Sequence, residues 1–204
     1  MCRPAENAGA AELPTFASWR QPMADAELQE GWISVCENAG RFLALNQEMV
    51  AALAACLSAL GHRPIVEVCA GNGELARALN ASDVTVVATD ANADVNPGVQ
   101  RLVAQEALRR YQPELVLGCF VPADSGVDEA VLASRFVRHY VILNARIGGM
   151  YGASSLWNNS HWKAEPLRNI SRWMVTRHDV LLSGHGDGMM ESIQHGEAWH
   201  LERS

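Results

Sequence analysis

The sequence lacks the long hydrophobic and basic runs that mark several classes of protein. Its longest apolar run, residues 49–57, is far shorter than the roughly 18 residues that a membrane-spanning helix needs. No basic run exceeds Arg109-Arg110, and 16 basic against 23 acidic residues give a formal charge of −7. Because proteins that bind nucleic acid through its phosphates need a face rich in Lys and Arg, we expect neither nucleic acid nor a membrane as a partner.

Cysteine pairs at short spacing are also missing. The five cysteines are odd in number and widely spaced, and they form no C-x-x-C pair. This pattern is typical of reduced thiols rather than of a disulfide framework. The first residues, "MCRPAENAGAAELP", contain no apolar stretch of the kind found in secretion signals. We therefore expect a cytoplasmic protein.

The sequence also lacks any histidine spacing that is typical of a metal site. Four histidines near the end of the chain, with Asp187 and Glu197 between them, have the right ligand chemistry but match no zinc or iron signature. These histidines are His178, His185, His195 and His200. We expect no metal.

The length of 204 residues favours one domain, since a domain averages about 150 residues. Residues 1–22 show no sustained periodicity and are interpreted as a loose N-terminal arm. Residues 23–61 carry apolar residues at helical spacing and are expected to form N-terminal helices, the second of them over 46–60 and ending at Gly61. These helices either pad the sheet or act as a lid. Residues 62–204 are expected to form the ligand-binding α/β domain.

From Pro64 onward, short apolar runs alternate with helical segments. The runs "PIVEVCAG", "VTVVATD", "ELVLGCF" and "HYVILNA" predict strands, and "GELARAL" and "DEAVLASRF" predict helices between them. Strands that do not alternate with polar residues are typical of a sheet covered on both faces. The pattern predicts an α/β fold with a doubly wound, mostly parallel sheet. Residues 174–204, with a Gly-rich turn in the middle, are interpreted as an antiparallel pair at the sheet edge.

The first strand runs into the glycine-rich turn "AGNG", at the place where open parallel sheets bind ligands. Gly71 and Gly73 leave room for a ligand to approach the backbone. Together with Ala76 they match the looser dinucleotide pattern G-x-G-x-x-G/A. The carboxylates of Glu67 and Glu74 would lie close to a diphosphate and disfavour it. A nicotinamide cofactor nevertheless stays open at this point.

The stretch "EVCAGNG" resembles the first motif, E/D-x-G-x-G-x-G, of class I S-adenosylmethionine-dependent methyltransferases, with Cys69 in place of the first glycine. The resemblance covers about residues 64–144 and implies a Rossmann-like methyltransferase fold with S-adenosylmethionine as cofactor. It implies that Glu67 holds the ammonium of the cofactor and that Asp90 accepts hydrogen bonds from the ribose hydroxyls. Gln105 and Glu106 are then expected near the adenine. The full predicted cofactor set is Glu67, Ala70, Gly71, Gly73, Asp90, Ala91, Gln105, Glu106, Cys119 and Phe120.

Two departures from the family pattern carry expectations of their own. Cys69 suggests a slightly less tight turn than a glycine would make. The segment "CFVPADS" is not the N/D-P-P-Y/F of enzymes that methylate amino groups of bases or glutamine amides. This departure further favours a small-molecule substrate over nucleic acid.

The segment after the last parallel strand, residues 144–162, is expected to lie over the same crevice and to carry the catalytic residues. Its candidates are Tyr151, Asn158 and His161, of which His161 or Tyr151 would act as a general base if the acceptor must lose a proton. Trp157 and Trp162 are candidate walls for a cationic group. The alternative is a surface loop whose tryptophans cover the core.

The sequence thus predicts an enzyme that transfers a methyl group from S-adenosylmethionine to a small-molecule acceptor. One alternative keeps the cofactor but uses the sulfonium for cyclisation, lyase or rearrangement chemistry. Another is a non-catalytic binding subunit, because a fold alone does not establish chemistry. The sequence does not determine the oligomeric state.

Overall fold

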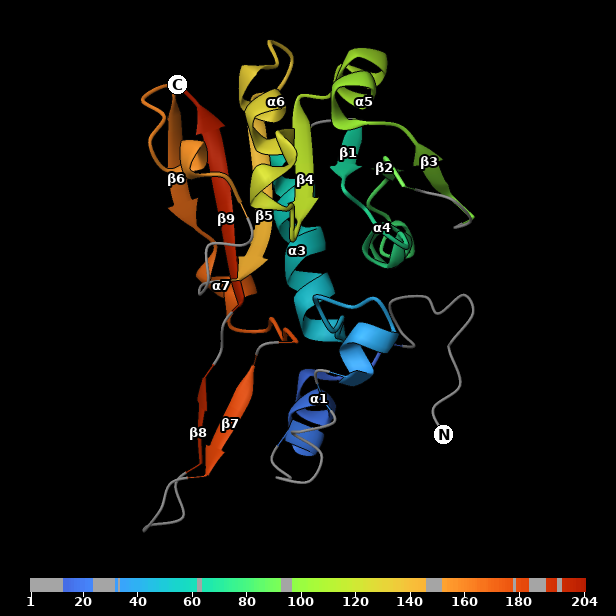
Figure 1. Ribbon diagram of the computed structural model, residues 1–204, viewed down its shortest axis with the longest axis vertical. Coiled ribbons are helices and arrows are strands. Elements are labelled where there is room, and N and C mark those ends of the chain that lie inside the picture. The colour runs from blue at the N-terminus through green and yellow to red at the C-terminus, as the bar shows by residue number, and fades with distance from the viewer. Residues whose placement is uncertain are drawn as a thin grey trace.

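The computed structural model describes residues 13–23, 32, 34–61, 64–92, 97–145, 152–177, 179–183, 190–193 and 196–204. Seven strands form the main sheet, in the order β3-β2-β1-β4-β5-β9-β6 (Figure 1). Their bounds are β1 Ile65–Val68, β2 Val86–Asp90, β3 Val99–Arg101, β4 Leu115–Cys119, β5 His139–Ala145, β6 Trp162–Pro166 and β9 Gly196–Arg203. The described helices are α1 Phe16–Met23, α3 Gln47–Leu60, α4 Glu74–Asn80, α5 Ala104–Tyr111, α6 Val127–Ala133 and α7 Arg168–Ser171, with short 3-10 turns η2 Ala123–Ser125 and η3 Ser154–Leu156.

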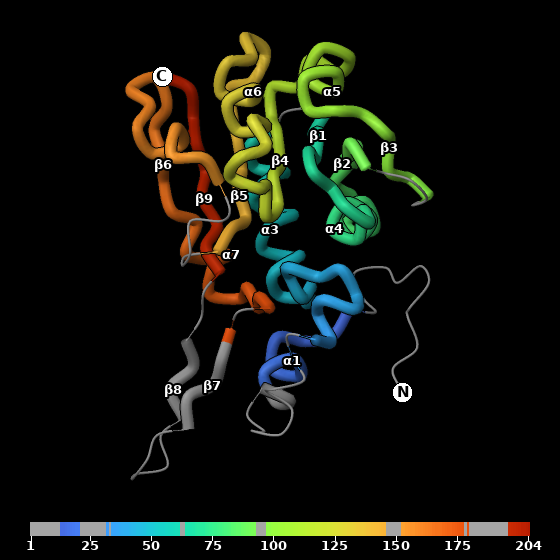
Figure 2. Tube along the Cα trace, in the orientation of Figure 1, coloured from blue at the N-terminus to red at the C-terminus, as the bar shows by residue number. Residues whose placement is uncertain are grey.

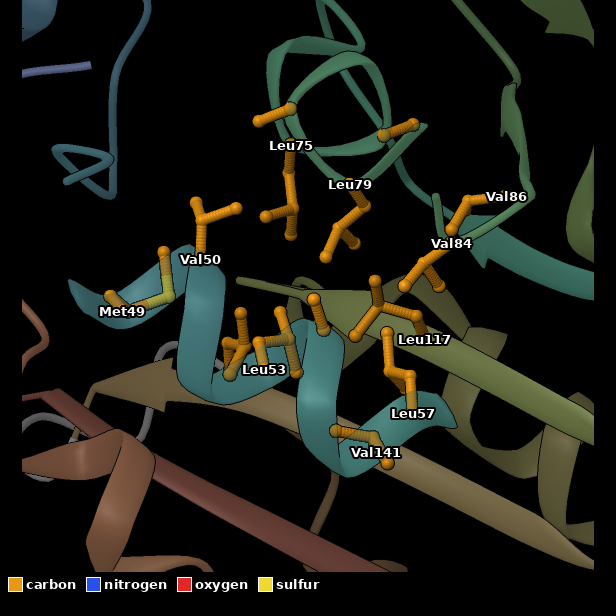
Figure 3. Close-up of a cluster of buried hydrophobic side chains, with 14 of the residues drawn as sticks. Met49, Val50, Leu53, Leu57, Leu75, Leu79, Val84, Val86, Leu117 and Val141 are labelled. Carbon is orange, nitrogen blue, oxygen red and sulfur yellow. The ribbon is translucent and has the colours of Figure 1, made fainter. Parts of the chain in front are cut away.

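Strands β1 to β5 pair in parallel, with helices as the connections between most of them. Each of the central strands contributes alternate residues to two apolar clusters, one on each face of the sheet. On β1, Ile65 packs into the cluster under α3 and α4, and Val66 into the cluster under α5 and α6. Figure 3 shows Leu53 and Leu57 of α3 meeting side chains of the sheet in the first cluster. The predicted doubly wound α/β fold, mostly parallel with an antiparallel edge pair, is confirmed.

The antiparallel strands of the main sheet come only in part from the segment that the sequence indicated. Strand β9, red in Figure 2, lies between β5 and β6 and is antiparallel to both. Its edge partner β6 comes from residues 162–166, which the sequence placed at and beyond the end of a crevice loop. The two segments around the Gly-rich turn, β7 Val180–Ser183 and β8 Met190–Ile193, do form an antiparallel pair as expected, but in a separate two-stranded sheet rather than at the edge of the main sheet. Lys163 and Glu165 form an ion pair on the exposed edge strand, a common way of protecting such an edge.

The N-terminal segment is more helical than expected in one place. Helix α1 occupies the end of the segment interpreted as a loose arm, and Phe16 meets Trp173 edge to face. Helix α3 follows its expected bounds: the Asn46 side chain accepts a hydrogen bond from the Met49 amide, and Gly61 ends the helix with φ +70°. Within the described ranges, no helix is long and apolar enough to cross a membrane.

Candidate functional site

A cavity of about 460 Å³ opens where β1, β2 and β4 end. Its walls come from five parts of the chain: the segment 40–45, the turn between β1 and α4, the tip of β2, the start of α5, and the segment after β4. These are the carboxyl ends of parallel strands on both sides of the point where the strand order reverses from β1 to β4. The cavity therefore occupies the usual ligand crevice of an open α/β sheet.

The two glycines of the turn serve different purposes. Gly71 has φ +54°, and a Cβ built on it would meet nothing within 4 Å, so the backbone here faces open space. Gly73 has φ +71°, and a Cβ would come within 2.5 Å of Val99 Cγ2. Gly71 thus exposes the backbone to the cavity, whereas Gly73 lets α4 pack against the sheet. Gly71 lines the cavity and Gly73 does not.

Two non-glycine residues at the cavity also adopt left-handed backbone conformations. Cys69 has φ +54° and Phe120 has φ +52°, and both line the cavity from the ends of neighbouring strands. A side chain in this region of backbone space costs roughly 1–2 kcal/mol. Cys69 does not loosen the turn, as the sequence suggested, but keeps the glycine conformation under strain. Such strain is concentrated at binding sites more often than elsewhere.

Glu67 is the most unusual charged residue of the site. It lies on β1 with 1% of its surface exposed, lines the cavity, and has an oxygen, Oε2, without a hydrogen-bond partner. Burial raises the pKa of Glu67 from its usual 4.5 to about 8, and the carboxylate of Asp90 adds to the rise. A backbone hydrogen bond at Ala76 and the charge of Arg77 oppose it. A cation in the cavity beside Oε2 would supply the missing partner.

Asp90 ends β2 at the mouth of the cavity. Its Oδ2 accepts a hydrogen bond from the Gly71 amide at 2.9 Å, and its Oδ1 accepts one from the Asn92 amide at 2.8 Å. These bonds fix the carboxylate between the two strand tips. Because a carboxylate has about four acceptor positions, it retains capacity for two donors from a ligand.

Most of the predicted cofactor residues meet at this cavity. Gln105 reaches it from the first turn of α5, and Ala70, Ala91 and Cys119 complete the walls near the strand tips. The exceptions are Gly73, which packs inward, and Glu106, which lies one position past Gln105 on α5 and does not line the cavity. The residues that do line the cavity are close together because of the fold, since each lies at or just beyond the carboxyl end of a parallel strand.

Sequence reasoning missed the wall formed by the segment 40–45. The guanidinium of Arg41 pairs with the carboxylate of Glu74 through two hydrogen bonds, of 3.1 and 3.3 Å. The ring of Phe42 stacks on Phe120 with centroids 5.7 Å apart. A backbone bridge joins Leu43 to Thr176. The only signal in the sequence was that this segment lies within residues 23–61, whose helices were expected either to pad the sheet or to act as a lid.

The predicted catalytic residues are not brought together by the described structure. Tyr151 lies outside the described residues. Asn158 donates a hydrogen bond to the Ser154 carbonyl and is exposed, and His161 directly precedes β6. Neither lines the cavity.

The reason lies in the direction of β6. At Gly152 the chain is still beside the cavity, since the Gly152 amide donates to the Val121 carbonyl. Strand β6 runs parallel to β5, so the chain must first return to the opposite edge of the sheet. There the carbonyl of His161 accepts a hydrogen bond from Ser204, the last residue. A strand where the sequence predicted a crevice loop therefore carries His161 away from the site.

The described part of the chain contains no group of three or more residues placed to hold a metal ion. Of the four histidines considered from the sequence, only His200 is described. Its Nε2 lies 3.0 Å from Nδ1 of His139 on the neighbouring strand. Burial lowers the pKa of His200, which favours its neutral form.

No family model and no curated protein sequence matches the chain. Several solved structures resemble it in fold. One is precorrin-6y C5,15-methyltransferase from Geobacter metallireducens, with 16% identity over 78% of this chain and 88% of that one, and a TM-score of 0.46. Another is the methyltransferase domain of a bacterial Hen1, with 7% identity over 78% and 99% of the two chains, and a TM-score of 0.48. A third is the 23S rRNA methyltransferase ErmE, with 14% identity over 80% and 70%, and a TM-score of 0.45.

These structures agree with the predicted resemblance to class I methyltransferases. They also correct one expectation. The 23S rRNA methyltransferase and a putative RNA methyltransferase from Pyrococcus horikoshii, which shows 10% identity and a TM-score of 0.43, are described as enzymes of RNA. The exclusion of nucleic acid as a partner was therefore wrong. It rested on net charge, which sums over the whole surface and says nothing of how charge is distributed locally.

Proposed function

We propose that the cavity binds S-adenosylmethionine and that the protein is a methyltransferase. The observation that carries this proposal is the buried Oε2 of Glu67, which lines the cavity without a partner. A buried carboxylate without a partner is strongly destabilising unless a ligand satisfies it. The ammonium group of the methionine part of the cofactor is a donor of the required charge. When bound, the cofactor supplies a methyl group activated by a positive sulfur.

The charges around the cavity favour this cofactor over a dinucleotide. Glu67, Glu74 and Asp90 line the walls, and the guanidinium of Arg41 is already held by Glu74. A diphosphate would lie beside the carboxylate of Asp90 and the paired carboxylate of Glu74, with little positive charge to offset its own, and it would oppose ionisation of Glu67. A ligand with a sulfonium and an ammonium group gains attraction from the same residues.

The remaining roles follow the position of each wall. Asp90 would accept hydrogen bonds from ribose hydroxyls with its two remaining acceptor positions. Gln105 would bind the adenine with its side-chain amide, beside the apolar Val103. Phe42 and Phe120 would exclude water from the end of the cavity beyond β4, where alignment and dryness are the main requirements of methyl transfer.

The catalytic roles suggested from the sequence are only partly retained. Asn158 and His161 are left out of the proposal because they do not line the cavity. A role for Tyr151 stays a prediction, as does the small-molecule acceptor.

Isothermal titration calorimetry with S-adenosylhomocysteine, S-adenosylmethionine and a nicotinamide dinucleotide tests the cofactor. We expect the first two to bind and the third not to bind. Heat from the dinucleotide alone would contradict the proposal. No heat from any of the three would favour a non-catalytic subunit, and binding without release of S-adenosylhomocysteine in the presence of acceptors would favour non-methylating chemistry.

The variant Asp90→Ala tests the binding mode. We expect it to weaken binding of S-adenosylhomocysteine by about 1–3 kcal/mol, because two charge-assisted hydrogen bonds to the ligand are lost. Asp83→Ala removes a carboxylate from the exposed turn before β2 and serves as the control, with unchanged affinity expected. Equal affinity of the wild type and Asp90→Ala would overturn the assigned role of Asp90.

A further inference from the structure

A second hollow, of about 560 Å³, lies where the edge strand β6 ends, away from the cavity described above. Its walls include Pro166 of β6, Arg168 and Ser171 of α7, Arg172 just beyond that helix, and Glu197 and Trp199 of β9. None of these residues has a role in the proposed cofactor site. The hollow combines two guanidinium groups with an indole ring.

The two arginines are placed to bind an anion. Arg168 and Arg172 are four residues apart, a spacing that puts side chains on the same side of a helical turn, and both are exposed. No carboxylate within the described ranges pairs with either guanidinium. The guanidinium of Arg172 lies over the ring of Trp173, 4.7 Å from its centroid, which holds the side chain at the surface. Planar guanidinium groups are well suited to phosphate oxygens.

The aromatic side of the hollow is fixed in orientation. The indole N–H of Trp199 donates a hydrogen bond to Oε2 of Glu197 at 3.3 Å. Trp157 meets Trp199 edge to face, with centroids 5.0 Å apart, and is itself 48% exposed. Trp199 itself lines the hollow and is partly exposed, and an accessible indole is a favourable surface for stacking of a base. Because the carboxylate of Glu197 would repel an anion, a phosphate bound in this hollow would lie on the side of α7, beside the two arginines.

We propose that this hollow binds a nucleotide unit, with its phosphate on Arg168 and Arg172 and its base against Trp199. Such a unit is either a free nucleotide or one residue of a single-stranded RNA, since both carry the same phosphate and base. The local excess of positive charge at α7 is consistent with the net charge of −7, which is spread over the whole chain.

The position of the hollow relative to the cavity suggests what nucleotide binding there would do. Strand β6 runs parallel to β4, so its carboxyl end lies at the same edge of the sheet as the cavity. Three strand spacings separate β4 from β6, or roughly 14 Å. A methyl acceptor that contains phosphates would be held at a second point along this edge. This use rests on the proposed function, whereas nucleotide binding itself does not.

Fluorescence anisotropy with a labelled single-stranded RNA of about eight nucleotides tests the proposal. We expect the wild type to bind the RNA and the double variant R168Q/R172Q to bind it at least about tenfold more weakly. The control R135Q/R138Q removes the same charge from an exposed pair elsewhere, in which Arg135 also lies over its neighbouring ring, that of Phe136. It should change the affinity by less than about twofold.

Competition separates the two sources of the nucleotide. Adenosine monophosphate should displace the RNA, and inorganic phosphate at the same concentration should not. Direct binding of adenosine monophosphate without RNA binding, lost in R168Q/R172Q, would also support the hollow, as a site for a free nucleotide. Binding of neither probe, equal weakening by the control pair, or displacement by phosphate as strong as by the nucleotide would each overturn the proposal.

The contribution of the indole is tested with two variants. Trp199→Leu should weaken RNA binding and Trp199→Phe should restore most of it, because a phenyl ring still stacks. Calorimetry with S-adenosylhomocysteine on R168Q/R172Q keeps the two proposals apart. If R168Q/R172Q loses RNA binding but gives the same heat with S-adenosylhomocysteine as the wild type, the hollow is a separate site. If the wild type binds RNA but gives no heat with S-adenosylhomocysteine, the nucleotide site stands and the proposed methyltransferase function fails.

Discussion

The parallel strands of the main sheet have their carboxyl ends along one edge, the carboxyl edge, and their amino ends along the other, the amino edge. Polar groups are satisfied less completely at the carboxyl edge than at the amino edge. At the carboxyl edge, Glu67 has a buried oxygen without a partner, and Cys69 and Phe120 hold strained backbone conformations. At the amino edge, the guanidinium of Arg203 donates hydrogen bonds to three backbone carbonyls and lies over the ring of Trp162. Left-handed non-glycine residues occur at both edges, with Asp83 and Gln112 at the amino edge, but the buried oxygen of Glu67 lies at the carboxyl edge, where a ligand can satisfy it.

The difference teaches that stability and binding are separated along the strands. Parallel strands bury their middles on both faces, so core packing does not discriminate between their two ends. The ends are distinguished by their loops. At the amino edge, hydrogen bonds join neighbouring segments, such as those from the Arg138 and His139 amides to the Glu114 carbonyl, whereas the loops at the carboxyl edge leave a cavity with acidic walls. Three substitutions test this separation.

The largest effect is expected in the pH dependence of the free energy of unfolding, which arises from the titration of Glu67. The pKa of this carboxyl is raised from 4.5 to about 8 in the folded protein, so the folded state holds a proton that the unfolded state has lost between these values. The contribution of Glu67 to stability is therefore full below about pH 4.5 and is lost as the pH rises toward 8. The loss amounts to roughly 5 kcal/mol.

Glu67→Gln should remove this pH dependence, because a neutral amide replaces the titrating carboxyl. Urea denaturation of the ligand-free protein at about pH 6 and pH 8 measures the difference between the wild type and the variant. The same variant should lose binding of S-adenosylhomocysteine. A wild type and a variant with parallel pH profiles would show that Glu67 is not the unsatisfied group of this edge.

The second effect concerns the opposite edge. Arg203→Ala should lower the free energy of unfolding by about 3 kcal/mol, because carbonyls of Leu132, Ser134 and Val137 lose a charged donor. Affinity for S-adenosylhomocysteine should not change, since Arg203 lies at the far edge. A loss of affinity in protein that is still folded would contradict the separation of the two edges.

The smallest effect is expected from relief of backbone strain. Cys69→Gly should raise the free energy of unfolding by about 1 kcal/mol, because glycine adopts φ +54° without a penalty. The control is the reverse change, Gly61→Ala, at a position with φ +70° where an added Cβ meets nothing within 4 Å. It should lower stability by a similar amount, and thermal denaturation measures both. If Cys69→Gly is destabilised like the control, the strain assigned to Cys69 is absent.

Local patterns predicted several residues that line the cavity. The turn from Glu67 to Gly73 and the position of Asp90 are fixed by strand, turn and helix signals that lie within a few residues of each other. Parallel pairing then places their strand tips at the same edge. Helix α3 was likewise predicted within a residue or two, because its cap and its C-terminal glycine are adjacent in sequence.

Other parts depend on contacts between distant residues, which no local pattern contains. The wall with Arg41 and Phe42 depends on partners some 30 and 80 residues further along the chain. The segment 162–166 is short and charged, and it becomes a strand only because β9 offers it a partner. Because this strand forms, His161 lies at its start, at the opposite edge from the cavity, and does not line the cavity.

The sequence by itself determined the alternation of strands and helices, the glycine turn and the acidic residues at the strand tips, because each is encoded by neighbouring residues. Only the tertiary structure decided that β9 enters the sheet between β5 and β6, that Oε2 of Glu67 lacks a partner, and that two arginines and a tryptophan line one hollow at the end of β6. Burial and pairing are properties of the packed chain, and they emerge only when residues far apart in sequence exclude water together.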